Sequence, residues 1–459
     1  MAEDKAKLWG GGFSEGMHPA LAAISESLEQ DLPLADADLR GSAAYARALG
    51  RCGVLSEDES ARLSDGLLEL RGDLAHGRWI PTDAEDVHGA IEAEVTRRLP
   101  GLGERLHTGR SRNDQVSTAF RIAVREGVDT VIERIRRLQS ALVARAKDEL
   151  DTLVPSYTHI QRAQPIRLAH WILGYFWPLE RDVSRLQDAR KRLNVLPLGS
   201  GAVSGHPFGI DRPWLAEQLG FDGITENSLD TVGDRDFAIE FCFSSSMLAV
   251  HLSRLAEELV LWSSTEFGYV QWPDGLATGS SLMPNKKNPD LAELVRGRAA
   301  QSIGDVVSLL TLVKGLPSSY QRDLQDDKPP VWRALRTSTT SLDAMAAAME
   351  SIRFNRDRMR AALTDDTLAT ELADLLVDRG IAFRTAHHIV GQIVAEGRSR
   401  QMGSKDLARA APDALPAEVS PEDIEGLSAE AAIERRQAAG GTGRGAVEAQ
   451  IAAAEERLT

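Results

Sequence analysis

Residues 114–150 read DQVSTAFRIAVREGVDTVIERIRRLQSALVARAKDEL and carry the longest helical pattern in the chain. Apolar side chains recur at intervals of three or four, at Val116, Phe120, Val124, Val128, Val131, Ile135, Leu138 and Leu142. This spacing places them on one face of an α-helix. At ~1.5 Å per residue such a helix extends over about 55 Å. The stretch therefore predicts a long amphipathic helix whose apolar face must be covered.

Similar periodic patterns predict four more long helices, at 166–193, 235–270, 289–312 and 330–352. Five long helices in sequence indicate an all-α protein built around a helical bundle. The pattern at 235–270 is apolar over much of its circumference, so we expect that helix to be buried on several sides. Symmetric homo-oligomers commonly cover such surfaces, and we expect the chain to self-associate.

The pattern divides the chain into three expected helical domains. Residues 1–113 carry shorter, interrupted helical patterns, residues 114–353 carry the long helices, and residues 354–459 again carry short ones. Strand signals are few, and the apolar run at 195–198 is too short to define a sheet. We therefore expect an N-terminal domain, a central bundle and a small C-terminal domain.

Composition argues against several classes of function. The formal net charge of −15 disfavours a nucleic-acid partner, which needs a basic face. No run approaches the ~18 apolar residues of a membrane-spanning helix. Cys52 and Cys242 lie in helical patterns without metal-ligand spacing, which favours buried thiols in a reducing compartment. We expect a cytoplasmic protein without a metal or cofactor, whose anionic ligands are drawn by local positive charge.

Residues 279–289, GSSLMPNKKNP, carry two hydroxyls, two ammonium groups and two carboxamides together with a glycine and two prolines. Turn chemistry alone does not require this set, because adjacent lysines repel each other. The segment predicts a mobile loop that surrounds a carboxylate. Glu293 follows in the first turns of the next helix, where a carboxylate either complements the helix dipole or reaches a histidine from another loop.

Two polar stretches precede predicted helices. In 106–115, LHTGRSRNDQ, capping accounts for Ser111, Asn113 and Asp114 but not for the arginines, and Arg112 beside a helix start favours a carboxylate. In 156–165, SYTHIQRAQP, hydrogen-bonding groups flank His159, which is either a working imidazole or a solvated side chain.

Two further features are less specific. Residues 314–328 offer Tyr320, Gln325 and Lys328 on a segment between two long helices, which is either a ligand loop or a solvated connector. His88, in the sequence EDVH, is a candidate to orient or bind a carboxylate.

Several of these strings occur together and in order: LHTGRSRNDQV, YTHIQRAQP, NVLPLGSGAVSG, GSSLMPNKKNP, KGLPSSYQRDLQDDK and GGTGR. Their combination resembles the argininosuccinate lyase family of the fumarase/aspartase superfamily, over nearly the whole chain. The resemblance implies a mostly helical homotetramer with a twenty-helix core and active sites assembled from three subunits. It also implies reversible β-elimination of argininosuccinate to arginine and fumarate, in arginine biosynthesis.

The resemblance assigns roles residue by residue. It implies that Ser280 and His159 form the acid/base pair, that Glu293 partners His159, and that Lys286 and Asn288 hold the carboxylate of the reacting carbon. Positions matching substrate-binding residues are Ser27, Asn113, Thr158, Tyr320, Gln325 and Lys328. The chain departs from the family's usual pattern at Gly12, Gly233 and Asn285.

Three questions stay open at this point. The sequence does not decide which of Ser280 and His159 takes the carbon proton. Another fumarate-releasing lyase of the superfamily is the nearest alternative activity. A structural protein of the delta-crystallin type is the alternative outside enzymes, although the presence of Ser280, His159, Lys286 and Glu293 together argues against it.

Overall fold

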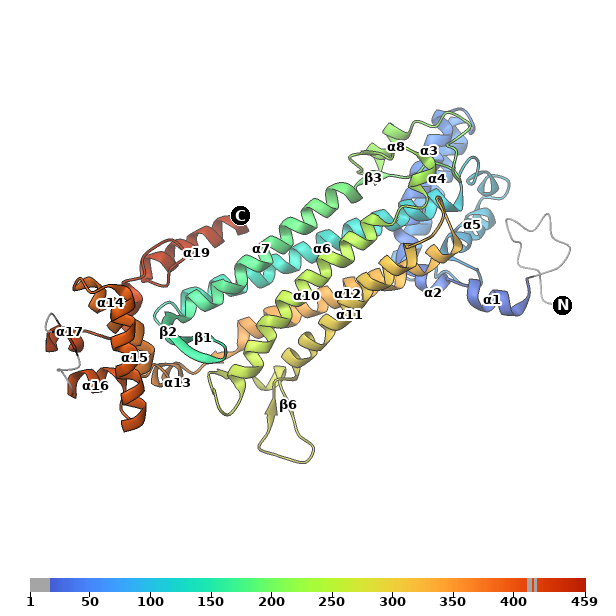
Figure 1. Ribbon diagram of the computed structural model, residues 1–459. Coiled ribbons are helices and arrows are strands. Elements are labelled where there is room, and N and C mark those ends of the chain that lie inside the picture. The colour runs from blue at the N-terminus through green and yellow to red at the C-terminus, as the bar shows by residue number, and fades with distance from the viewer. Residues whose placement is uncertain (1–16, 411–414, 417–418) are drawn as a thin grey trace. The chain divides into compact units, whose positions relative to one another are not determined.

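The computed structural model describes residues 17–410, 415–416 and 419–459, so Gly12 lies outside the described residues. The five long helices are α6 (Arg112–Asp148), α7 (Leu168–Leu193), α10 (Asp236–Ser263), α11 (Asp290–Val313) and α12 (Lys328–Ser351) (Figure 1). The prediction of an all-α protein with five long helices is confirmed.

Shorter helices make up most of the remaining regular structure. Before α6 lie α1 (Pro19–Ser25), α2 (Leu28–Asp31), α3 (Ala35–Arg51), α4 (Glu57–Ala75) and α5 (Val87–Arg98). Between α7 and α10 lie α8 (Arg212–Gln218) and α9 (Ser228–Thr231). After α12 come α13 (Arg356–Ala361), α14 (Ala369–Asp378), α15 (Phe383–Arg400), α16 (Ser404–Ala410), α17 (Pro421–Glu425), α18 (Ala429–Glu434) and α19 (Arg444–Leu458). Short 3-10 turns include η5 (Arg322–Asp327) and η6 (Asp365–Leu368).

The prediction for 235–270 is wrong at its C-terminal end, because α10 stops at Ser263. The chain turns at Gly268, whose φ of +62° favours glycine. Val270–Gln271 then forms strand β5, which pairs with β8 (Arg353–Phe354). The apolar residues after Ser263 therefore continue the hydrophobic pattern as a strand and not as a helix.

The polar stretch 156–165, which the sequence suggests is a loop before a helix, lies instead in a pair of strands. Strands β1 (Leu153–Thr158) and β2 (Gln161–Arg167) form an antiparallel hairpin with a register shift between Pro155 and Tyr157. Pro155 pairs with Pro165 across the hairpin. Because proline has no N–H to donate to a ladder, prolines in both segments argue against strands in the sequence. The other ladders have two residues a strand: β3 (Val195–Leu196) with β4 (Gly223–Ile224), and β6 (Thr278–Gly279) with β7 (Lys287–Asn288).

The described residues form two compact units. Unit 1 comprises those within 1–132, 184–246 and 300–338, and unit 2 those within 133–183, 247–299 and 339–459. Each of the five long helices contributes one part to unit 1 and the other to unit 2. The three-domain division expected from sequence stays a prediction.

Aromatic side chains mark the interior of each unit. In unit 1 the ring of Phe120 on α6 packs edge-on against Phe237 and Trp332, with centroids 5.3 and 5.5 Å away. In unit 2 Trp171 of α7 stacks on Trp262 of α10 at 4.1 Å. These contacts cover the apolar helix faces that the sequence pattern predicts.

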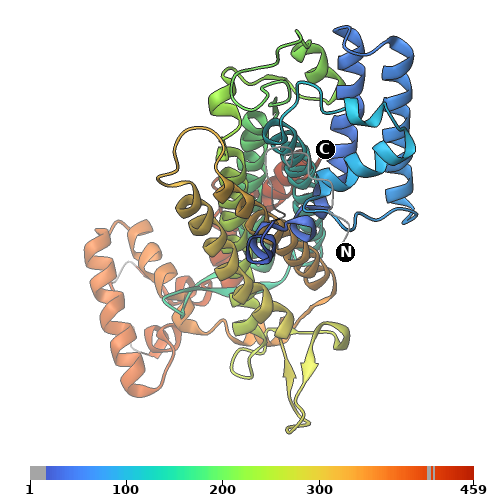
Figure 2. The same cartoon turned by 90° about the vertical axis from the view of Figure 1, so that its right-hand side faces the viewer.

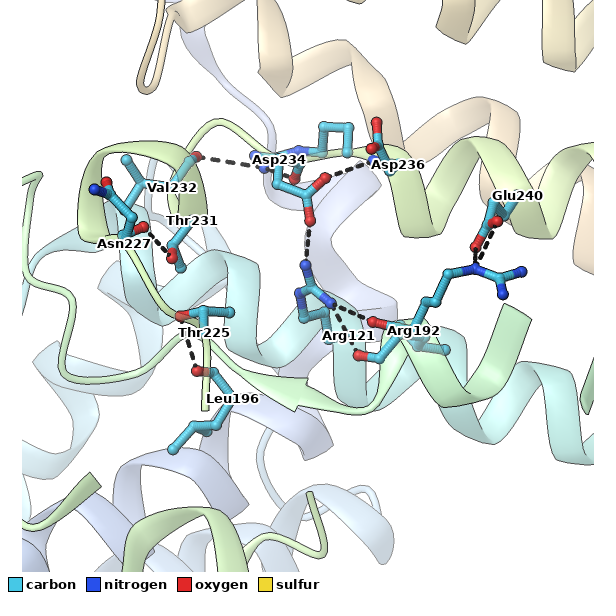
Figure 3. A network of polar contacts seen from close by, with 12 residues as sticks. Arg121, Arg192, Leu196, Thr225, Asn227, Thr231, Val232, Asp234, Asp236 and Glu240 are labelled. Atoms are coloured by element: carbon cyan, nitrogen blue, oxygen red, sulfur yellow. Dashed lines mark hydrogen bonds and ion pairs between the residues drawn. The ribbon is translucent and has the colours of Figure 1, made fainter. Parts of the chain in front are cut away.

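A buried arginine fixes the start of α10 within unit 1 (Figure 3). Arg121 of α6 donates to the carbonyl of Leu193 at 2.9 Å, pairs with Asp234, and lies 4.4 Å over the ring of Phe237. Asp234 in turn accepts from the backbone N–H of Asp236, the first residue of α10, at 2.8 Å. One guanidinium therefore joins three segments of the chain.

None of the helices in the described part of the chain is long and apolar enough to cross a membrane.

Candidate active site

Unit 1 holds Ser27 and Lys328 in a buried polar cluster. The Ser27 hydroxyl donates to Asp31 Oδ2 at 2.5 Å, and Lys328 Nζ lies 4.0 Å from Asp31 Oδ1. Lys328 Nζ also donates to Asp327 at 2.9 Å, and Asp327 pairs with Arg235. Burial raises the pKa of Asp31, while the Lys328 ammonium opposes that rise. Two cations and two carboxylates thus balance each other inside the unit.

The segment before α12 is fastened beside Ser27. Gln325 Nε2 donates to the carbonyl of Ser25 at 3.3 Å, and Arg322 donates to the same carbonyl at 3.0 Å. Arg322 also pairs with Glu85 at 2.8 Å, and the Ser27 N–H donates to the Glu85 carbonyl. Unit 1 therefore brings together Ser27, Gln325 and Lys328, which the sequence resemblance predicts to bind substrate.

Tyr320 lies half-buried in the same segment, and burial raises the pKa of its phenol. Its neighbour Ser319 has a φ of +74°. A Cβ atom placed on Gly233 would lie 2.6 Å from the Ser319 carbonyl oxygen. The departure at Gly233 thus has a local reason, because a larger residue would displace the backbone next to Tyr320.

Arg112 and Asn113 occupy the first turn of α6. Arg112 donates to Gln115 at 3.0 Å and lies 3.4 Å from Asp86, which caps α5 by accepting from Gly89. Asn113 Nδ2 lies 3.5 Å from the Ala202 carbonyl. The carboxylate beside Arg112 in this structure is therefore the chain's own.

Asp114 orders the loop that contains Gly199 and Gly201. The interpretation of Asp114 as a helix cap did not predict this role. The fully buried Asp114 carboxylate accepts from the backbone of Gly199 at 3.0 Å, Gly201 at 2.8 Å and Ser111 at 3.0 Å. Burial raises the pKa of Asp114 to about 6 against these hydrogen bonds. Gly199 and Gly201 have φ of +92° and +59°, so the loop depends on glycine at both positions.

A second buried pair lies beneath α6. His88 Nδ1 is 3.3 Å from Asp38, which also accepts from Gln115 Nε2 at 2.8 Å. Burial disfavours the charged carboxylate, but His88, Arg110 and Gln115 outweigh it and lower the pKa of Asp38 to about 2. Sequence reasoning proposed His88 as a partner for a carboxylate, but Asp38 carried no local signal that could identify it.

Unit 2 holds Thr158 and His159 at the exposed tip of the β1–β2 hairpin. The two tip residues, His159 and Ile160, have φ of +54° and +57°. A left-handed conformation at both positions is typical of a two-residue type I′ turn, which normally selects Asn-Gly. It is unfavourable for β-branched Ile160, which is also 67% exposed. Strain of this kind at an exposed turn is often associated with function.

The Ser280 loop closes the β6–β7 hairpin, which extends away from the helices of unit 2 (Figure 2). The Ser280 hydroxyl accepts from the N–H groups of Leu282 and Met283, at 3.2 and 3.0 Å. Leu282 is 83% exposed and Lys286 is exposed beside it, while Asn288 pairs with Thr278 in the stem. The loop thus presents a hydroxyl, an ammonium group and apolar side chains to its surroundings.

Glu293 lies in the first turn of α11, 3.9 Å from Arg296. The described residues show no contact between Glu293 and His159 or between His159 and Ser280. The β1–β2 and β6–β7 hairpins lie apart in both views (Figures 1 and 2). A single chain therefore does not bring the acid/base residues together, and their roles stay predictions.

No group of three or more His, Cys, Asp or Glu side chains among the described residues is placed to hold a metal ion. The groups available for chemistry are hydroxyls, an imidazole, carboxylates, amides and cations. They are suited to proton transfer and to stabilising negative charge.

Comparison with known families and proteins identifies close relatives. The family described as Lyase matches residues 11–304, and the one described as Argininosuccinate lyase C-terminal matches residues 366–434. Argininosuccinate lyase of Roseiflexus sp. (strain RS-1) is 45% identical over 97% of this chain and 98% of its own. Argininosuccinate lyase of Thioalkalivibrio sulfidiphilus (strain HL-EbGR7) is 45% identical over 98% of this chain and 97% of its own.

Solved structures share the fold. The crystal structure of EDDS lyase in complex with formate superposes with a TM-score of 0.83 at 30% identity, covering 93% of this chain and 87% of that chain.

Proposed function

The chain belongs to the argininosuccinate lyase family, and we propose that it cleaves argininosuccinate reversibly to arginine and fumarate by β-elimination. Family membership rests on about 45% identity over nearly the full length of both chains. The observation in the structure that most supports this activity is the exposed β6–β7 hairpin, which presents Ser280 and Lys286 on one loop.

The reaction requires a proton to leave the carbon next to a carboxylate. The resulting charge spreads onto that carboxylate as an aci-carboxylate, which Lys286, Asn288 and the loop amides near Ser280 would stabilise. Donors of this kind are each worth about 3 kcal/mol in a site that excludes water. The loop must therefore close over the substrate before the proton is removed.

Ser280 and His159 are proposed as the acid/base pair, with Glu293 raising the basicity of the imidazole. One of them removes the carbon proton, and a proton must reach the guanidine nitrogen as the carbon–nitrogen bond breaks. The proposed binding residues are Ser27, Arg112, Asn113, Thr158, Tyr320, Gln325 and Lys328. The buried cluster around Asp31 supports this assignment, because it fixes the positions of Ser27 and Lys328 before substrate arrives.

We further propose that the complete site forms in a homotetramer. Four large apolar side chains of unit 1 on α10 and α11 are exposed: Phe243 50%, Ile303 49%, Val307 58% and Leu310 50%. A patch of this kind is rarely left open to water, and a second copy of the chain would cover it. Val307→Glu should lower the mass measured by light scattering and abolish turnover. A variant that stays monodisperse at wild-type mass would contradict the proposal.

We also propose a cytoplasmic location. Cys52 and Cys242 are both free thiols, and Cys242 is buried. Free buried thiols are typical of reducing compartments. Fractionation of the source cells would test the proposal, and recovery outside the cytoplasm would refute it.

The activity is tested by mixing the purified protein with argininosuccinate and no added metal or cofactor. We expect fumarate and arginine to appear in equal amounts, followed by absorbance and by amino-acid analysis. Turnover of aspartate or adenylosuccinate instead would indicate another lyase of the superfamily. Tetramers without turnover on any of these substrates would indicate a structural protein.

A further inference from the structure

A cavity of about 550 Å³ lies in unit 2 at the base of the β6–β7 hairpin. Its walls are formed by β5 with the following residues to Asp274, by Lys287 of β7, by Ser351 at the end of α12 and by Arg353 of β8. None of the proposed catalytic or substrate-binding residues lines it. The volume is within the range of small-molecule sites.

Two cations line this cavity. Arg353 is exposed and has no acidic partner among the described residues. Lys287 pairs with Asp274 at 2.6 Å, but the Asp274 side chain is fully exposed and Lys287 is 45% exposed. An ion pair this exposed contributes little to stability, so a ligand can replace Asp274 at little cost. Lys287 also belongs to the loop motif, although the proposed reaction uses its neighbours Lys286 and Asn288.

The wall of the cavity also contains an unsatisfied donor. Trp272 is 5% exposed, and its indole Nε1–H has no acceptor among the described residues. Buried donors are normally hydrogen-bonded, so this unpaired indole N–H is an exception among the residues around the cavity. The cavity is thus rich in donors and cations, with one weakly held carboxylate.

We propose that this cavity is a binding site for a small oxyanion of the carboxylate or phosphate type, held between Lys287 and Arg353. Guanidinium and ammonium groups bind such anions through charge-assisted hydrogen bonds.

The site is coupled to the Ser280 loop through the hairpin stem, and this step rests on the proposed function. Lys287 pairs with Gly279, the residue before Ser280, while Arg353 pairs with Gln271 in the β5–β8 ladder. An anion between the two cations therefore ties the stem of the loop to the rest of unit 2. Because loop closure precedes proton removal, such an anion regulates turnover.

Calorimetric titration tests the site without substrate, so its outcome is independent of the proposed activity. Inorganic phosphate and succinate are titrated separately into the full-length wild-type protein, Arg353→Gln and Lys287→Gln. We expect one Arg353-dependent site per chain for at least one anion, with affinity reduced at least about tenfold in both variants. The anion that binds identifies whether phosphate or carboxylate is the preferred chemistry.

Two controls separate this site from other sources of binding. Arg360→Gln removes an equally exposed arginine that pairs with Glu430 outside the cavity, and Lys286→Ala disables the catalytic loop. Both should retain the Arg353-dependent site. The proposal is overturned if neither anion binds the wild type, if Arg353→Gln titrates like the wild type, or if Arg360→Gln loses the same binding.

Limited proteolysis gives a second readout. Trypsin should cleave after the exposed Lys287, and the bound anion should slow this cleavage several-fold in the wild type but not in Arg353→Gln. Equal protection in both proteins would place the anion elsewhere.

Discussion

The proposed site residues of unit 1 and those of unit 2 lie in contrasting surroundings. Ser27 and Lys328 are 6% and 4% exposed, and both contact Asp31, which is itself buried. His159 lies on an exposed hairpin tip and Ser280 on an exposed loop, where its hydroxyl accepts from two amides of that loop. Ser27 and Lys328 are thus part of the folded interior, whereas the groups proposed for proton transfer lie on exposed hairpins.

This difference indicates that substitutions in the buried cluster and substitutions on the hairpins should have different effects on stability and on turnover. Replacing a group in the buried cluster should affect folding as well as binding, because its partners lose their compensation. Replacing a group on a hairpin tip should change turnover far more than stability. Four predictions test this contrast.

The largest effect is expected from Ser280→Ala. Loss of general acid/base transfer should lower kcat by about 10²- to 10⁴-fold, with the urea unfolding midpoint unchanged. Fumarate release measures turnover, and Ser281→Ala is the matched control because it removes a neighbouring exposed hydroxyl. A Ser280→Ala enzyme with near-normal kcat would refute the assignment, and a large loss of stability would refute the contrast.

Lys328→Met should destabilise unit 1 by about 3 kcal/mol, because Asp31 Oδ1 is buried and would lose its nearest cation. Asp327 retains Arg235, which limits the cost. Urea unfolding measures the change. Lys314→Met replaces an exposed lysine of the same unit and should lie within ~0.5 kcal/mol of the wild type. Equal stability of the two variants would break the comparison.

Protonation of His107 should weaken unit 1 in acid, whereas Asp114, whose pKa burial raises to about 6, acts in the opposite direction as the pH falls. Burial, together with Arg110 and Arg112, lowers the pKa of His107 to about 4 from 6.5. Between these values the unfolded chain binds more protons, so the free energy of unfolding falls as the pH falls from 6.5 to 4. The contribution of His107 is about 3 kcal/mol.

His107→Gln should therefore flatten the pH dependence of unfolding in this window. His76→Gln serves as the control, since His76 is exposed at the end of α4. A wild-type slope in His107→Gln would show that another group causes the acid sensitivity.

The smallest effect is expected from Ile160→Gly at the hairpin tip. A left-handed residue other than glycine destabilises the folded state by about 1–2 kcal/mol, and glycine removes this strain. Glycine also increases the conformational entropy of the unfolded chain, which offsets part of the stabilisation. We expect a net stabilisation below ~1 kcal/mol in thermal unfolding, with a lower kcat because the tip holds His159 less firmly. Ile80→Gly, at an exposed position without positive φ, should instead be neutral or destabilising.

The long helices were predictable because their signal is local and repeated. Over thirty residues, each turn of 114–150 adds an independent apolar position, so packing and periodicity agree. The helix predicted at 235–270 is too long because the apolar residues Tyr269, Val270 and Trp272 are compatible with either a helix or a strand. Short segments carry too few periods to distinguish the two.

The β1–β2 hairpin and the buried clusters were not predictable for different reasons. Pro155 and Pro165 oppose each other across the hairpin, which single-strand rules treat as evidence against a strand. Asp31 and Asp38 are ordinary helical acids in the sequence, and their partners lie far away along the chain. Pairings of this kind depend on tertiary packing, which local composition does not encode.

The two-residue tip of the β1–β2 hairpin restricts insertions and deletions in this part of the chain. Side chains alternate between the two faces of a strand, so inserting or deleting one residue beside His159 would invert the facing of every position beyond it. Substitutions at Ile160 are tolerable, but changes in length are not. Natural variants of this hairpin should therefore differ in composition while conserving the number of residues from Thr158 to Gln161.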